Sequence, residues 1–127
     1  MAVLNTEYMG LSLKSPVIVG SSGLTNSVEK MVKLANAGIG AIVLKSLFEE
    51  QILAEVHSVH ANDSSQNAES LDYIESYISN KYVEDYLNLI KDTKNSVDVP
   101  VIGSINCITV GEWLKYAEKY SVQVPML

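Results

Sequence analysis

The strongest constraint on the fold comes from an uninterrupted apolar run, Ala41-Ile42-Val43-Leu44, which leads directly into a charged residue, Lys45. Four successive aliphatic residues without alternation are typical of a strand that is covered on both faces, as in parallel α/β sheets. The ligands of such sheets and of βα barrels bind at the carboxyl ends of the strands. Lys45 and Ser46 are therefore candidate site residues, although a lysine at this position can also cover apolar surface and extend into water.

Two further apolar segments are predicted to be buried strands. Residues 17–19 lead into the small-residue turn Gly20-Ser21-Ser22-Gly23, and residues 99–107 end in a polar stretch from Ser104 to Cys107. A helix from Asn26 to Gly38, opened by a capping box of Asn26 and Glu29, joins the first strand to strand 40–45. The carboxyl ends of parallel strands share one edge of a sheet, so we expect these polar tips (residues 20–23, 45–46 and 104–107) to converge.

The other elements are predicted from hydrophobic periodicity and turn residues. Residues 3–14 form a β-hairpin around Met9-Gly10 with one face in water. Residues 48–59 fit either a short helix or an extended segment, and residues 61–69 fit a polar loop. Apolar stripes at 71–78 and 83–90 predict two helices. A capping box at Thr109 predicts a last helix, on which Trp113, Leu114 and Ala117 face inward.

Composition limits the class of protein. The 127 residues, 47% hydrophobic and 19% charged, suit one globular domain over residues 1–127. A net charge of −6 argues against nucleic acid or an anionic membrane as partner, but permits a small anionic ligand. A single cysteine, Cys107, excludes an internal disulfide, and no signal peptide or apolar run of roughly 18 residues is evident. We therefore expect a soluble cytoplasmic protein. His57 and His60 lack further ligands, so no metal site is expected.

Four segments together resemble the N-terminal part of dihydroorotate dehydrogenase-like proteins: Leu4–Leu13, Pro16–Gly23, Ala41–Ser46 and Ser104–Cys107. The similarity runs over residues 3–119. It implies the N-terminal part of a (β/α)8 TIM barrel that binds FMN, with three parallel barrel strands present and the hairpin closing the N-terminal end. A complete barrel takes about 250 residues, so a truncated form or fragment is expected, with the family's catalytic base outside this chain.

The resemblance also implies roles for individual residues. The backbone of the first turn would contact the flavin, through Gly20, Ser21, Ser22 and Gly23. Lys45 would lie beside the flavin and the substrate carboxylate, where a positive charge favours the reduced flavin. Ser46 would support Lys45 by hydrogen bonding, and Asn106 would contact the flavin or the substrate. No residue of this chain is expected to be the catalytic base.

Members of this family oxidise the CH–CH bond of dihydroorotate in pyrimidine synthesis, by proton abstraction and hydride transfer to FMN. Residues 69–74 lack the glycine, proline and paired asparagines of the family's orotate-binding loop, so a related small-molecule substrate is equally expected. Two other interpretations remain open. One is a non-catalytic half-barrel that functions by self-association into a homo-oligomer. The other is a small flavodoxin-like module that binds phosphate at the turn 20–23.

Overall fold

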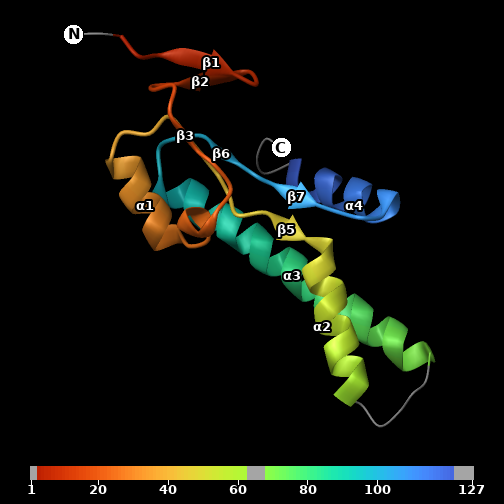
Figure 1. Cartoon of the computed structure of the whole chain (residues 1–127). Helices are drawn as coiled ribbons and strands as arrows, with labels where there is room; N and C mark the ends of the chain where they lie inside the picture. The colour runs from red at the N-terminus through yellow and green to blue at the C-terminus, as the bar shows by residue number, and fades with distance from the viewer. Residues whose placement is uncertain (1–2, 63–67, 122–127) are drawn as a thin grey trace.

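The computed structural model describes residues 3–62 and 68–121, which form a mixed α/β fold (Figure 1). Strands β3 (Ile18–Val19), β4 (Ala41–Val43) and β6 (Val101–Ile102) form one sheet in the order β3-β4-β6, and both pairs are parallel. The predicted α/β arrangement with parallel strands is confirmed. Because the three strands run in one direction, their carboxyl ends lie at one edge of the sheet.

The predicted third strand, residues 99–107, is wrong as a single strand. After β6 the chain passes Gly103 and Ser104 and then forms β7 (Ile105–Asn106). In the same way, β4 is followed by Leu44, Lys45 and Ser46 and then by β5 (Leu47–Phe48). β5 and β7 pair in parallel as a separate sheet, with Leu47 opposite Ile105. Each strand is interrupted by a segment that ends in a serine, Ser46 or Ser104, and hydrophobic patterning does not detect such a short break.

The described strands form separate sheets of two, three and two strands, and they do not close a barrel. The first of these sheets is the predicted hairpin, of β1 (Thr6–Tyr8) and β2 (Leu11–Leu13), which are antiparallel. Met9 and Gly10 form its turn with φ values of 53° and 74°, a conformation that glycine adopts readily.

The hairpin lies against the parallel sheet near the beginning of β4. Leu13 is buried against Ala41, Val43 and Ile102, which present one face of the sheet. Gly40 directly precedes β4, and a Cβ atom added there would lie 1.9 Å from the Ser15 carbonyl oxygen. The amino end of β4 is therefore covered by the chain itself, whereas the carboxyl end carries the polar tips.

Helix α1 (Val28–Asn36) begins one residue later than predicted. Ser27 is its N-cap, and the Ser27 hydroxyl oxygen accepts a hydrogen bond from the Lys30 backbone N–H at 3.5 Å. Asn26 is not the cap, because it ends a preceding 3-10 helix, η1 (Gly23–Thr25). A capping box does occur, but it is formed by Ser22 and Thr25 at the start of η1.

Helices α2 (Glu49–Asn62) and α3 (Ala68–Ser96) pack along each other (Figure 1). The helical alternative for residues 48–59 is thus correct. The two helices predicted at 71–78 and 83–90 are one helix of 29 residues, because the four residues between the stripes contain no glycine or proline. Of the predicted polar loop, residues 63–67 lie outside the described part, and its two ends belong to α2 and α3.

Helix α4 (Val110–Ser121) packs beside β7. Among the side chains of α4 that the structure describes, Tyr116 and Tyr120 are buried, four positions apart on one face. The prediction that Leu114 faces inward is wrong, since that side chain is 57% exposed, and Ala117 is half-buried. The side chain of Trp113 lies outside the described part.

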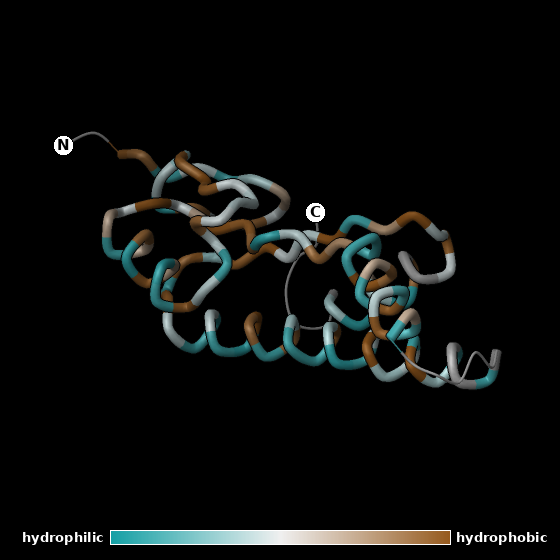
Figure 2. Tube along the Cα trace, turned by 60° about the horizontal axis from the view of Figure 1, so that its bottom comes forward, coloured by the Kyte–Doolittle hydropathy of each residue, from teal (hydrophilic) through white to brown (hydrophobic). Residues whose placement is uncertain are grey.

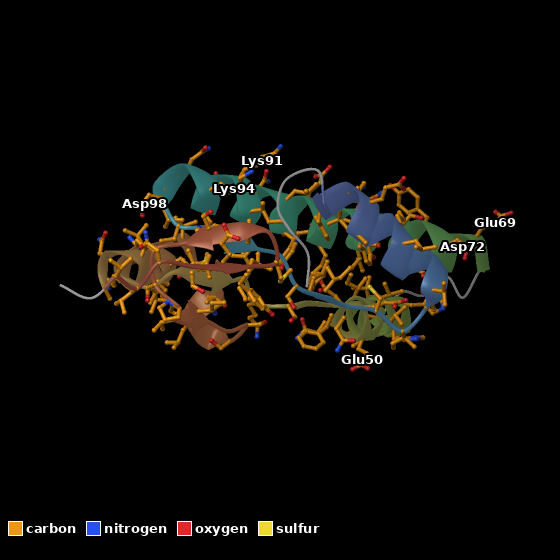
Figure 3. All side chains as sticks on the ribbon, turned by 90° about the horizontal axis from the view of Figure 1, so that it is seen from above. Glu50, Glu69, Asp72, Lys91, Lys94 and Asp98 are labelled. Carbon is orange, nitrogen blue, oxygen red and sulfur yellow. The ribbon has the colours of Figure 1, made fainter. Side chains whose placement is uncertain are left out.

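One large hydrophobic core joins most elements. It packs α1, α3 and α4 against the sheet face that carries Ile42, Leu44 and Val101. Figure 2 shows hydrophobic residues gathered in the strand segments, while α3 alternates between hydrophobic and hydrophilic positions along its length. Charged side chains such as Glu50, Lys91 and Asp98 project outward (Figure 3).

Candidate functional site

Three serines, one from each polar tip, meet in a chain of hydrogen bonds. The hydroxyl oxygens of Ser21 and Ser46 lie 3.0 Å apart, and those of Ser46 and Ser104 lie 2.6 Å apart. The Ser46 backbone N–H also donates to the Ser21 hydroxyl oxygen at 2.8 Å. These residues follow β3, β4 and β6 respectively, so the expected convergence of the tips is observed. We call Ser21, Ser46 and Ser104 the serine cluster.

Lys45 lies directly beside the serine cluster and its side chain is exposed. Its backbone N–H donates to the carbonyl oxygen of Thr25 at 3.1 Å, which ties the end of β4 to the buried end of η1. Over residues 3–62 and 68–121, no ion pair or hydrogen bond involves the Lys45 ammonium group. The positive charge is therefore available to an anionic group that approaches this edge of the sheet.

The turn after β3 is held by its own side chains and leaves its outer side open. The Ser22 hydroxyl donates to the Gly20 carbonyl oxygen at 3.2 Å and accepts from the Leu24 backbone N–H at 3.2 Å. A Cβ atom placed at Gly20 or Gly23 would meet no atom within 4 Å. Both glycines are exposed, so a flat ligand can approach the backbone of the turn.

Tyr86 of α3 anchors the third tip from the core. Its hydroxyl group donates to the Ser104 carbonyl oxygen at 2.9 Å and accepts from the Ser104 backbone N–H at 3.0 Å. The same carbonyl oxygen accepts the Leu47 backbone N–H at 3.0 Å. Burial raises the pKa of Tyr86 to about 12, so the hydroxyl group stays protonated at physiological pH and remains a donor.

Asn106 is placed differently from the other predicted residues. It is exposed in β7, where it pairs with Phe48 of β5. Among the described residues, no hydrogen bond joins Asn106 to the serine cluster or to Lys45. The structure thus brings together residues 20–23, Lys45, Ser46 and Ser104, and it leaves Asn106 on the next strand segment.

A second polar feature lies where β5 leads into α2. Glu49 is 5% exposed, and its carboxylate accepts hydrogen bonds from the backbone N–H groups of Ile108 and Thr109 and from the Thr109 hydroxyl. Burial acts to raise the pKa of Glu49, but these hydrogen bonds outweigh it and hold the pKa below its usual value. Glu49 is therefore ionised at neutral pH, and it links α2 to the residues before α4.

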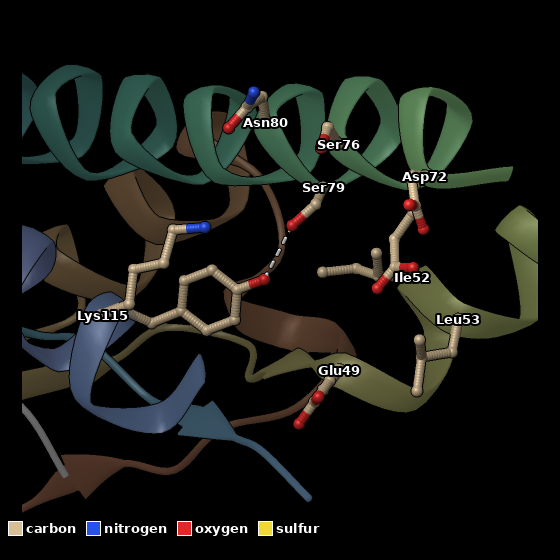
Figure 4. Close-up of a pocket in the computed structure, with 10 residues that line it drawn as sticks. Glu49, Ile52, Leu53, Asp72, Ser76, Ser79, Asn80 and Lys115 are labelled. Carbon is tan, nitrogen blue, oxygen red and sulfur yellow. Dashed lines mark hydrogen bonds between the residues drawn. The ribbon is translucent and has the colours of Figure 1, made fainter. Parts of the chain in front are cut away.

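Glu49 also lines a hollow of about 280 Å³ between α2, α3 and α4 (Figure 4). Opposite Glu49, the Ser79 and Tyr116 hydroxyl oxygens lie 2.9 Å apart. The Asp72 carboxylate points into the hollow from α3 (Figure 4). None of the residues predicted for the site lines this hollow, so it is separate from the serine cluster.

Sequence reasoning did not assign roles to Tyr86 or Glu49. Tyr86 falls on the apolar stripe at 83–90, and a residue on such a stripe is expected to belong to the core. The signal that could have marked it is its hydroxyl group, since a buried tyrosine hydroxyl usually requires a partner. The sequence contains a weaker signal for Glu49, because a glutamate in the first turn of a helix is common and does not indicate a distant hydrogen-bond partner.

The described residues contain no group of three or more histidine, cysteine or acidic side chains arranged to hold a metal ion. Each helix in this part of the chain is too short or too polar to cross a bilayer. Comparison with models of known protein families gives no match, and comparison with curated proteins finds none that is similar.

Proposed function

We propose that this chain is the N-terminal part of an FMN-dependent oxidoreductase of the dihydroorotate dehydrogenase type, in which the serine cluster and Lys45 form part of the flavin and substrate site. One observation carries the proposal: three polar tips from three parallel strands meet at one edge of the sheet, beside an exposed lysine. The resemblance in the four sequence segments implies a hairpin at the N-terminal end of the strands, and the hairpin that packs at the amino end of β4 supports the proposal in this respect.

The residues present fit a flavin in three respects. The backbone of Gly20 and Gly23 is exposed with open space beside it, which suits the close approach of a planar ring. Lys45 offers a positive charge with no partner among the described residues. The hydroxyl groups of Ser21 and Ser104 fix the position of Ser46, the residue that follows Lys45 in the chain. In this proposal residues 20–23, Lys45 and Ser46 hold FMN, and Asn106 contributes from the adjoining strand.

The chemistry assigned to these residues is electrostatic. Bound FMN would accept the hydride that leaves a CH–CH bond of dihydroorotate or a related small acid, while a base takes the proton. Lys45 would bind the carboxylate of the substrate and stabilise the negative charge that develops nearby, as a positioned cation does. Ser46, fixed by Ser21 and Ser104, would keep the backbone beside Lys45 in place. We place this activity in the cytoplasm.

Titration of the purified chain with FMN, followed by flavin absorbance and fluorescence, tests the proposal. The expected result is saturable binding that weakens at least about tenfold in Lys45→Ala and less in Lys45→Arg, since arginine keeps the charge. Lys14→Ala is the matched control, because Lys14 carries the same charge on the hairpin, where it pairs with Asp98 at 3.8 Å. Equal affinities in Lys45→Ala and Lys14→Ala would contradict the proposed site.

The same preparation separates the alternatives. The mass in solution shows whether the chain associates with itself, as a half-barrel that acts by self-association requires. Binding of inorganic phosphate that competes with FMN at residues 20–23 but does not depend on Lys45 would instead favour a phosphate-binding module. Binding that depends on Lys45 and shifts the flavin spectrum favours the oxidoreductase.

A further inference from the structure

We infer that Tyr86 is a positioning residue for the strand tips: its hydroxyl group bonds Ser104, and through Ser104 it sets the place of Ser46 and Lys45. The inference concerns a buried residue of the long helix α3. Its importance for ligand binding rests on the proposed function, whereas the positioning itself does not.

The first step is the contact between Tyr86 and Ser104. One hydroxyl group satisfies both backbone groups of Ser104, by accepting from its N–H at 3.0 Å and donating to its carbonyl oxygen at 2.9 Å. Ser104 lies between β6 and β7, where regular strand pairing is interrupted. Buried backbone groups require partners. Here the Tyr86 hydroxyl accepts the Ser104 N–H in place of a strand carbonyl group, and it shares the Ser104 carbonyl oxygen with the Leu47 N–H.

The second step leads from Ser104 to the tip of β4. The Ser104 hydroxyl lies 2.6 Å from the Ser46 hydroxyl, and the Ser104 carbonyl oxygen accepts the Leu47 backbone N–H at 3.0 Å. Both contacts fix the segment that carries Lys45. Ser46 in turn holds Ser21 by two hydrogen bonds, of 2.8 and 3.0 Å. Displacement of Ser104 therefore reaches all three tips.

The third step is the rigidity of the anchor. Tyr86 is 6% exposed and packs edge-on against Tyr120, with ring centroids 5.0 Å apart. Its aromatic ring is held by the core, so its hydroxyl group has little freedom to follow a displaced Ser104. The positions of the three tips are therefore constrained by the hydrophobic core as well as by the loops themselves.

Amide hydrogen exchange of Tyr86→Phe tests the positioning without any ligand. The informative signal is the Ser46 N–H, which bonds Ser21 and does not contact Tyr86. We expect its exchange to accelerate about tenfold, as local opening of the tips becomes easier. Tyr116→Phe is the matched control, because it also removes a buried tyrosine hydroxyl, one that contacts Ser79 at 2.9 Å, but leaves the tips untouched. If only the Ser104 amide responds, the inference is overturned.

FMN titration of the same two variants tests the link to function. We expect affinity to fall about tenfold in Tyr86→Phe and to remain at the wild-type value in Tyr116→Phe, even if both lose similar stability. Equal losses of FMN affinity in Tyr86→Phe and Tyr116→Phe would mean that Tyr86 acts only as a core residue, and would overturn the link between its positioning role and ligand binding. If the wild-type chain binds no FMN, the proposed function fails for this chain, while hydrogen exchange still decides whether Tyr86 positions the tips.

Ser104→Ala covers the case in which Tyr86→Phe does not fold. It keeps both bonds between Tyr86 and the Ser104 backbone and removes only the hydroxyl link to Ser46. Faster exchange at Ser46 with a still-protected amide at residue 104 supports the proposed order of contacts. Unchanged exchange at Ser46 contradicts it.

Discussion

The Glu49 carboxylate binds Thr109 twice, with one oxygen 3.0 Å from the Thr109 backbone nitrogen and the other 2.9 Å from the Thr109 hydroxyl oxygen. Glu49 begins α2, and Thr109 directly precedes α4, so the starts of two helices are tied to each other. A buried carboxylate with three donors is stable as an anion, because the hydrogen bonds replace its lost hydration.

Glu49→Gln is expected to destabilise the protein by about 1–2 kcal/mol at pH 7, since an amide replaces one acceptor by a donor facing N–H groups. The pKa of Glu49 is depressed below 4.5, so its contribution is present above that value and disappears as the pH falls through the folded-state pKa. Thermal unfolding of wild type and Glu49→Gln should be measured between pH 7 and pH 3. The difference in stability between the two proteins should become smaller as the pH falls.

Glu50→Gln is the control for that series, because Glu50 is exposed in the same helical turn. Its change in stability should stay within roughly 0.5 kcal/mol. A difference between Glu49→Gln and wild type that grows as the pH falls would contradict the assignment.

Gly40→Ala should lower stability by about 1–3 kcal/mol, because the new methyl group would lie 1.9 Å from the Ser15 carbonyl oxygen, which is backbone and cannot turn away. Urea unfolding measures the loss. Gly111→Ala provides the comparison: a Cβ there meets no atom within 4 Å, and alanine favours the helix, so stability should stay level or rise. Comparable losses in both variants would show that the contact with Ser15 is not tight.

Ser46→Ala and Ser104→Ala should each cost about 1 kcal/mol, and the double variant should cost less than the sum, because each single change already breaks the 2.6 Å contact. A double-mutant cycle by urea unfolding gives the coupling energy, expected at about 0.5–1.5 kcal/mol. The pair Ser46 and Ser12 should be additive, since Ser12 is exposed on the hairpin. Additivity for Ser46 and Ser104 would argue against a direct bond.

Tyr120→Phe should leave stability unchanged or raise it by up to about 1 kcal/mol. The Tyr120 side chain is fully buried, and within the described residues its hydroxyl group has no hydrogen-bond partner, so removing it relieves an unsatisfied polar atom. Burial likewise raises the pKa of this hydroxyl, which stays neutral. In Tyr116→Phe, by contrast, the bond to Ser79 is lost and stability should fall. A clear loss in Tyr120→Phe would reveal a partner for that hydroxyl.

Much of the fold was predictable, because its signals are local. The run 41–44 has no alternation, and its burial on two faces follows directly from that pattern. The same prediction is wrong for residues 17–19, where Val17 is 56% exposed and Ile18 and Val19 are half-buried. The interruption of the last strand at Gly103-Ser104 was not predictable, since it is accompanied by hydrogen bonds between the Ser104 backbone and Tyr86, which lies 18 residues away in the sequence. The single helix over 68–96 was missed because periodicity alone is the same for one helix and two, although the lack of glycine and proline in residues 79–82 favours one.

The candidate site was predictable in outline only. Parallel strands bring their tips together, so residues 20–23, Lys45 and Ser46 could be grouped before any geometry was known. The position of Asn106 was missed because it depends on how the chain bends after β6. The roles of Tyr86 and Glu49 depend on partners 18 and 60 residues away, and single-sequence patterns carry no information on such pairs.

The length of α3 has a consequence for how the chain folds. Contact between Ser46 and Ser104 joins residues 58 positions apart, and closing so long a flexible loop costs considerable chain entropy. Once α3 has formed, 29 of the intervening residues behave as one stiff segment. Pairing of β4 with β6 is therefore expected to follow helix formation, and substitutions that weaken α3 on its exposed face should slow the assembly of the sheet they never touch.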